Sequence, residues 1–202
     1  MSKFIFLHKV FRGGNTLIKI FIDQGHNPEG PNTGAEGLGL YEDEVTYEVG
    51  RYLYNLLMEN GEFDVMLSRD TPNEVLGSTN AESLRLRVNM ANNWGADYFI
   101  SIHTNAVSNP SANGSEAFVY RREGEAYPFA ESILNSVVRK MGTRNRGVKI
   151  RPSLYVLRKT KMPAVLIELG FLTNPSDAQK MRNDAYGFAY AIYQGILNYF
   201  GL

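Results

Sequence analysis

The chain has 202 residues, of which 44% are hydrophobic and 21% charged, so it is long and apolar enough to form a globular domain with its own core. Its 21 basic and 21 acidic residues cancel, and the composition therefore gives no electrostatic sign of nucleic-acid binding. Cysteine is absent and no run of about 18 apolar residues occurs, which excludes a disulfide framework, a thiolate metal site and a membrane-spanning helix.

Residues 1–15 are expected to form a peripheral N-terminal segment. Their apolar stretch, residues 4–7, is too short for the core of a signal peptide, and no small-residue cleavage site follows it. Residues 16–202 contain no repeat, low-complexity tract or linker, so we interpret them as one domain.

In the first half of this domain, apolar runs and helical spacing predict two strands and two helices. The strands are residues 16–23 and 63–69, and the helices are residues 43–58 and 81–94. A glycine-rich loop, residues 27–39, follows the first strand. The first helix has acidic residues in its first turn, where the helix dipole favours negative charge, and we expect it to end at Asn60-Gly61.

The second half predicts four more strands and three helices. The strands are residues 97–102, 115–120, 154–157 and 163–169, and the helices are residues 126–141, a short helix from Ser176, and residues 185–200. Residues 143–147 are expected to form a basic turn. Because strands alternate with helices, we predict a single α/β domain with a mostly parallel, mixed sheet of about six strands and helices on both faces.

Polar side chains follow three of these apolar strands. His26 comes just after the first strand, where Gly25 is expected to let the backbone turn sharply. His103 and Glu168 each end a further strand, and the carboxyl ends of parallel strands meet at one edge of a sheet. Glu42 stands at the start of the first helix. The sequence therefore predicts that these four side chains lie close together.

Two histidines and one carboxylate can hold a zinc ion with a fourth position open to water. We therefore expect His26, Glu42 and His103 to bind one zinc ion per chain. Glu168 would be the general base that takes a proton from water and passes it to a leaving amine.

Each of these residues also has a more ordinary interpretation. A histidine at a strand end is more often a hydrogen-bonded loop residue, and Glu42 alone could simply interact with the helix dipole. However, two of the three histidines follow apolar strands in the same way, whereas His8 has no such context. Glu168 directly follows an apolar run, and a buried carboxylate is costly unless it pairs with a cation or takes part in chemistry.

The motifs around these residues resemble those of the zinc-dependent N-acetylmuramoyl-L-alanine amidases of the third amidase type. The resemblance covers about residues 17–200, with its motifs in the order of that family. The matching stretches are residues 22–26 (IDQGH), 39–42 (GLYE), 67–70 (LSRD), 87–92 (RVNMAN), 96–106 (ADYFISIHTNA), 146–147 (RG), 156–158 (VLR) and 163–174 (PAVLIELGFLTN).

The resemblance implies that residues 16–202 are a zinc amidase catalytic domain acting on peptidoglycan. It implies the same ligands, His26, Glu42 and His103, and the same base, Glu168. Some members of the family carry a long inserted helix that blocks the site until a partner moves it. The short connection from His103 to Ser115 leaves no room for such a helix, so we expect a domain that needs no activator protein. We also expect the chain to be a monomer.

Parts of the sequence also fit a zinc carboxypeptidase or a non-catalytic wall-binding module. A zinc carboxypeptidase would need a cationic group for a terminal carboxylate, which Arg144, Arg146, Arg151 or Arg158 could supply. A non-catalytic wall-binding module could use the aromatic residues, 12% of the chain, to stack on sugars, but it would not need Glu168. No Gly-x-Ser-x-Gly motif for a serine hydrolase occurs, and a glycosidase using Glu42 and Glu168 would leave the histidines without a role. The wall substrate is extracytoplasmic, but the sequence does not identify the cellular location of the chain.

Overall fold

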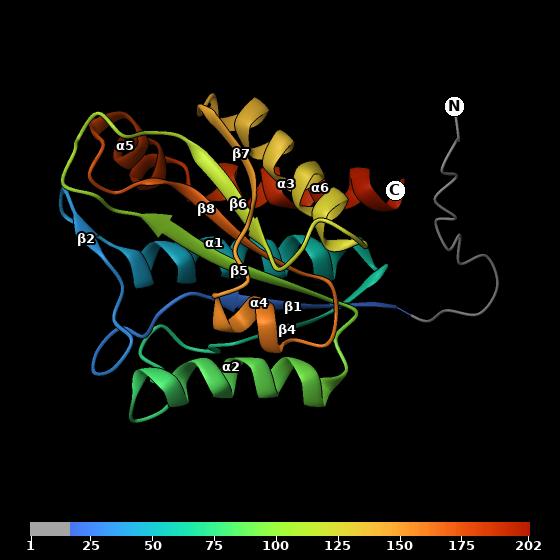
Figure 1. Ribbon diagram of the computed structural model, residues 1–202. Coiled ribbons are helices and arrows are strands. Elements are labelled where there is room, and N and C mark those ends of the chain that lie inside the picture. The colour runs from blue at the N-terminus through green and yellow to red at the C-terminus, as the bar shows by residue number, and fades with distance from the viewer. Residues whose placement is uncertain (1–16) are drawn as a thin grey trace.

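The structure is a computed structural model that describes residues 17–202, so the predicted segment 1–15 lies outside the described residues. These residues form eight strands and six helices (Figure 1). The strands are β1 (Ile18–Gln24), β2 (Glu36–Gly37), β3 (Leu40–Tyr41), β4 (Phe63–Leu67), β5 (Tyr98–Asn105), β6 (Ser115–Val119), β7 (Asn145–Ile150) and β8 (Ala164–Phe171). The helices are α1 (Glu42–Asn60), α2 (Asn80–Trp94), α3 (Ala126–Met141), α4 (Tyr155–Lys159), α5 (Pro175–Asn183) and α6 (Ala185–Phe200). None of the helices is long and apolar enough to span a membrane.

A six-stranded mixed sheet forms the centre of the molecule, with strand order β4-β1-β5-β8-β6-β7. The first four of these strands run parallel to one another. The strand β6 is antiparallel to β8, and β7 runs parallel to β6. The predicted fold class, an α/β domain with a mostly parallel, mixed sheet of about six strands, is therefore confirmed.

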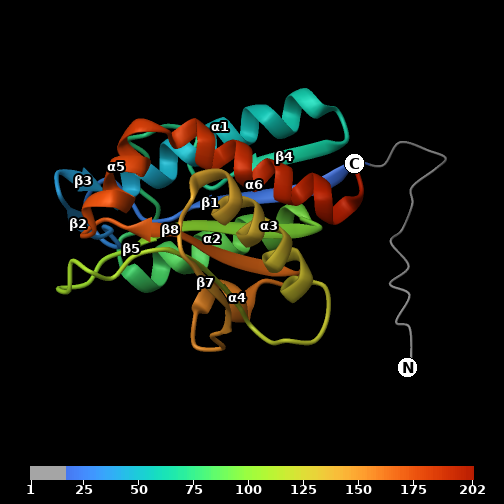
Figure 2. The same ribbon diagram turned by 90° about the horizontal axis from the view of Figure 1, so that it is seen from above.

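Helices cover both faces of the sheet. On one face α6 packs between α1 and α3, and the apolar side chains of these three helices join those of the strands in the larger core (Figures 1 and 2). The helices α2 and α4 lie on the other face over a smaller core that includes the stacked rings of Phe21 and Phe99. The two layers bury both sides of the parallel strands, as expected for strands that read as continuous apolar runs.

The bounds of α2 follow from its local sequence. The hydroxyl of Thr79 accepts a hydrogen bond from the backbone N–H of Glu82 at 3.1 Å, which caps the first turn. Gly95 ends the helix with a φ of 72°, a left-handed conformation that glycine adopts without strain. This helix lies beneath the carboxyl end of β1 and brings Arg87 to the candidate site described below.

Two predicted elements are wrong. The predicted strand at residues 154–157 is instead the N-cap, Leu154, and the first turn of the helix α4, because so short an apolar run fits a buried helical turn equally well. In the expected basic turn, residues 143–147, the last three residues instead begin β7. This strand lies at the edge of the sheet, where charged residues are common and the alternating apolar pattern is weak.

The strands that carry the candidate residues extend further than predicted. The strand β5 continues two residues past His103, and β8 continues three residues past Glu168. Their pairing is irregular between His103 and Asn105, where the register shifts. Such bulges bend a strand and redirect its side chains, and they are common beside functional sites. Residues 106–114, which connect β5 to β6, contain no helix, in agreement with the length of that connection.

Candidate active site

The structure brings His26, Glu42 and His103 together at the carboxyl ends of β1 and β5. Glu42 lies between the two histidines: its Oε2 is 3.2 Å from His26 Nε2, and its Oε1 is 3.1 Å from His103 Nδ1. The potential ligand atoms of the three residues all lie within 4.8 Å of one another. Both histidines are about one-fifth exposed, so the group opens to solvent on one side. This arrangement has the donor atoms that zinc prefers.

Glu42 is held as a carboxylate anion. It is the first residue of α1, and its two oxygens accept backbone N–H groups of Thr104 and Ala35, each at 2.9 Å. Burial alone would raise the pKa of Glu42, but hydrogen bonds with His103 and His26 and their charges outweigh it and hold the pKa well below its usual value. An ionised carboxylate throughout the neutral range is what a metal ligand requires.

The orientation of His26 also suits a metal ligand. Its Nδ1 lies 3.1 Å from the carbonyl oxygen of Asn32, which can only accept, so Nδ1 carries the hydrogen. In the neutral form of the ring, the form that binds metals, Nε2 therefore directs its lone pair toward an oxygen of Glu42. Two lone pairs that face each other in this way need a cation or a proton between them, and a backbone carbonyl behind the ring is a common support for a metal-bound histidine.

The sharp turn after β1 is made by His26 and not, as was expected, by Gly25. His26, not Gly25, takes the left-handed conformation, with a φ of 70°. Gly25 is required for close packing: a Cβ there would lie 2.5 Å from His103 Cε1 and 2.6 Å from the carbonyl oxygen of Ile102. Gly34 is similar, because a Cβ there would lie 2.6 Å from Glu42 Cβ. Two glycines therefore leave the space that the candidate ligands occupy.

Gly25→Ala is expected to displace the ring of His103 and to weaken zinc binding by about tenfold or more, the size of effect that follows when the support of a ligand is lost. Competition with a chelator would measure the affinity. Gly61→Ala is the control, because its methyl meets nothing within 4 Å although its φ of 82° makes it costly for stability. Equal zinc affinity in the Gly25→Ala protein and the wild type would contradict this role.

Glu168 lies beside this group as the cross-strand partner of His103. Its Oε2 is buried and has no hydrogen-bond partner among the described residues. Burial raises the pKa of Glu168 well above its usual value, and the negative charges of Glu42 and Glu116 add to the shift. A buried carboxylate with a raised pKa and a free oxygen is suited to accept a proton, which is the property of a general base near neutral pH.

A buried ion pair supports the loop that carries His26. Arg87 donates to Asp23 Oδ1 at 2.7 Å, and to the carbonyl oxygens of Gln24 and His26 at 2.6 and 2.5 Å. The hydroxyl of Ser101 donates to the other oxygen of Asp23. Burial opposes ionisation of Asp23, but the charge and hydrogen bond of Arg87 and the hydroxyl of Ser101 lower its pKa. This pair was not predicted, although an arginine at an inner position of a helix indicates a buried partner.

Arg87→Met is expected to lower the free energy of unfolding by about 3–5 kcal/mol, because it leaves the charge of Asp23 buried without its partner. Urea unfolding would measure the change. Arg85→Met is a matched control on the same helix: its side chain is 59% exposed and water screens its pair with Glu82, so its loss should change the free energy of unfolding little. Similar losses in both variants would show that the buried pair has no special role.

Comparison with known proteins places the chain in a family. Residues 20–198 match the family described as N-acetylmuramoyl-L-alanine amidase. The chain is 39% identical to the N-acetylmuramoyl-L-alanine amidase CwlM of Bacillus licheniformis, over 84% of this chain and 63% of that protein. It is 38% identical to the N-acetylmuramoyl-L-alanine amidase LytC of Bacillus subtilis (strain 168), over 90% of this chain and 35% of that protein. The chain therefore spans between about one-third and two-thirds of these relatives.

Solved structures agree with this assignment. The N-acetylmuramoyl-L-alanine amidase from Clostridium difficile 630 superposes with a TM-score of 0.80 at 33% identity, covering 92% of this chain and 97% of that one. AmiC2 of Nostoc punctiforme superposes with a TM-score of 0.81, also at 33% identity, covering 94% of this chain and all of that one. Sequence and structure together show that the chain belongs to the N-acetylmuramoyl-L-alanine amidase family.

Proposed function

We propose that this chain is a zinc-dependent hydrolase that cuts the amide bond between N-acetylmuramic acid and L-alanine in peptidoglycan. The observation that carries the proposal is the arrangement of two histidines around an ionised Glu42, with the unpartnered oxygen of Glu168 beside them. The names of the relatives and solved structures support the same bond and substrate.

His26, Glu42 and His103 would hold one zinc ion. The fit rests on their donor set of two nitrogens and one oxygen, on the lone pair of His26 that faces Glu42, and on the open side of the group. Zinc bound there would act as a Lewis acid that activates water and polarises the carbonyl of the scissile amide. Elemental analysis of protein prepared without chelator is expected to find about one zinc per chain.

Glu168 would act as the proton carrier of the reaction. Its free oxygen accepts a proton from the water that attacks the carbonyl carbon, as its raised pKa favours. The same carboxyl group then donates that proton to the nitrogen of alanine as the carbon–nitrogen bond breaks. The backbone of β8 holds Glu168 between β5 and β6, so the group needs no reorganisation between the two steps.

End-group analysis of digested peptidoglycan tests this function. The zinc-loaded chain is expected to release new alanine amino termini, to lose this activity with a chelator and to regain it with zinc. New reducing sugar ends would indicate a glycosidase instead, and new amino termini on residues other than the first alanine would indicate a carboxypeptidase-like peptidase. Binding to the wall without any new end group would indicate a non-catalytic wall-binding module.

We also propose that the domain works without an activator protein. The support is the connection between β5 and β6, residues 106–114, which has no helix that could cover the site. One structural neighbour, the CwlD amidase from Clostridioides difficile, was solved in complex with the GerS lipoprotein, so partners do occur among related proteins. The digestion described above uses the purified chain alone, and activity only after addition of a second protein would contradict the proposal.

A further inference from the structure

Four neighbouring strands place ionisable side chains in one row across the sheet. Glu168 on β8 is the cross-strand partner of His103 on β5 and of Glu116 on β6. The pairing of β6 with β7 shifts register between Ser115 and Ala117, so Glu116 lies opposite the irregular start of β7. Cross-strand partners point to the same face of a sheet. The row therefore leads from the candidate metal site, through the base, to the cations of β7.

Glu116 binds both cations of β7, Arg146 and Lys149. Its side chain is only 6% exposed; Oε1 accepts from Asn105 at 2.9 Å, and Oε2 accepts from Arg146 Nε at 3.2 Å and from Lys149 Nζ. The guanidinium of Arg146 also donates to the carbonyl oxygen of Asn113 and lies 4.9 Å from the centre of the Phe171 ring. The cations are thus held in place by a buried carboxylate and a ring rather than extended freely into solvent.

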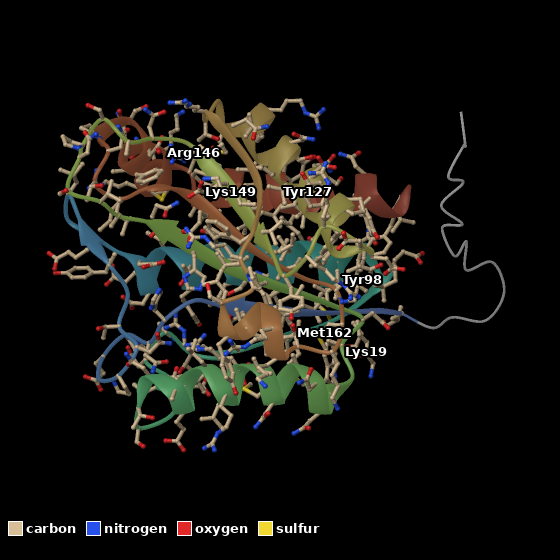
Figure 3. All side chains as sticks on the ribbon, viewed as in Figure 1. Lys19, Tyr98, Tyr127, Arg146, Lys149 and Met162 are labelled. Atoms are coloured by element: carbon tan, nitrogen blue, oxygen red, sulfur yellow. The ribbon has the colours of Figure 1, made fainter. Side chains whose placement is uncertain are left out.

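The charges in this cluster do not balance. Arg146 and Lys149 share the one carboxylate of Glu116, and no other acidic side chain in residues 17–202 pairs with either of them. The side chains of Arg146 and Lys149 are 28% and 43% exposed, so the accessible part of the cluster is positive. Figure 3 shows both side chains in the upper half of the molecule, away from Lys19, Tyr98 and Met162.

We propose that Arg146 and Lys149 form a subsite for a carboxylate of the peptide stem. This proposal rests on the proposed function, because the stem is the peptide that leaves the scissile amide. Neighbouring strands are about 4.8 Å apart, so β7 lies about 10 Å beyond Glu168. An extended peptide advances about 3.3–3.6 Å per residue, and its second or third residue would reach the two cations. The ligand class is therefore an acidic peptide bound through a carboxylate close to the cleaved bond.

Binding of two peptides to the zinc-loaded Glu168→Gln protein tests the subsite without hydrolysis. One probe is a stem peptide with free carboxylates, and the other is the same peptide with those carboxyl groups amidated. Calorimetric titration is expected to give a Kd about tenfold lower for the acidic peptide, as charge-assisted hydrogen bonds predict. A further Lys149→Gln or Arg146→Gln change should reduce this preference to roughly threefold or less. The carboxylate of Glu116 then neutralises the one cation that remains, so no net positive charge is left for the peptide.

Each of these changes leaves Glu116 paired with the remaining cation, and a thermal melt checks that the protein stays folded. Arg144→Gln is the matched control, because Arg144 is an exposed arginine just before β7 and its replacement should keep the tenfold preference.

Equal binding of the two peptides, binding of neither, or a preference that survives both the Lys149→Gln and the Arg146→Gln change would overturn the subsite. If the wild-type chain cuts the expected bond in any of these cases, the proposed function stands without the subsite. If the preference depends on Arg146 and Lys149 but no bond is cut, the subsite stands and the proposed function fails.

Discussion

Glu168→Gln is expected to lower kcat by roughly 10²–10⁴-fold, and more if the same carboxyl group also protonates the leaving amine. The amide keeps the volume of the side chain and its place between β5 and β6, but it has no basic oxygen. The fold, the zinc content and substrate binding should survive, because His26, Glu42 and His103 are unchanged. Initial rates on wall fragments, together with elemental analysis of the same sample, would measure the two effects.

Glu123→Gln is a suitable control, because it makes the same chemical change at an exposed position. It should leave the rate unchanged. Near-normal hydrolysis by the Glu168→Gln protein would remove the assignment of Glu168 as the base. Loss of zinc in that variant would instead make Glu168 a ligand.

Replacing both His26 and His103 with alanine is expected to lower zinc affinity by more than about 100-fold, since losing only the support of a ligand can cost 10–100-fold. Two of the three proposed protein ligands disappear, and Glu42 alone holds zinc weakly. The fold should persist, because both side chains are partly exposed and neither belongs to the apolar cores. Zinc content after dialysis and a thermal melt would measure both outcomes.

The third histidine, His8, provides the control for this experiment. His8→Ala should keep one zinc per chain. Full zinc occupancy in the double variant would contradict the assignment of His26 and His103 as ligands. Loss of zinc in the His8→Ala protein would point to a site that includes the N-terminal segment.

Long elements with strong periodicity could be predicted from the sequence. The bounds of α3 and α6, residues 126–141 and 185–200, are as expected, because apolar residues recur at helical spacing and a glycine follows each helix. The failures, α4 and β7, are short and lie where tertiary contacts decide the conformation. A run of four apolar residues does not distinguish a strand from a helical turn, and an edge strand need not alternate.

The candidate site could be predicted in part, because the carboxyl ends of parallel strands converge. That rule brought His26, His103 and Glu168 together before their distances were known. The side chains that support them could not be found in this way. Arg87 is 64 residues from Asp23, and Glu116 has its cations on the following strand, so neither pairing appears in the local sequence.

Mass spectrometry of a defined muropeptide after digestion by the zinc-loaded chain tests the central claim most directly. Two products are expected: a glycan fragment with a newly freed lactyl carboxyl group and an intact stem peptide with a new alanine amino terminus. Addition of Glu168→Gln protein to the same substrate should give neither product within the same time. Cleavage of a sugar–sugar bond or of a bond inside the peptide, or an unchanged substrate with wild-type protein, would contradict the account.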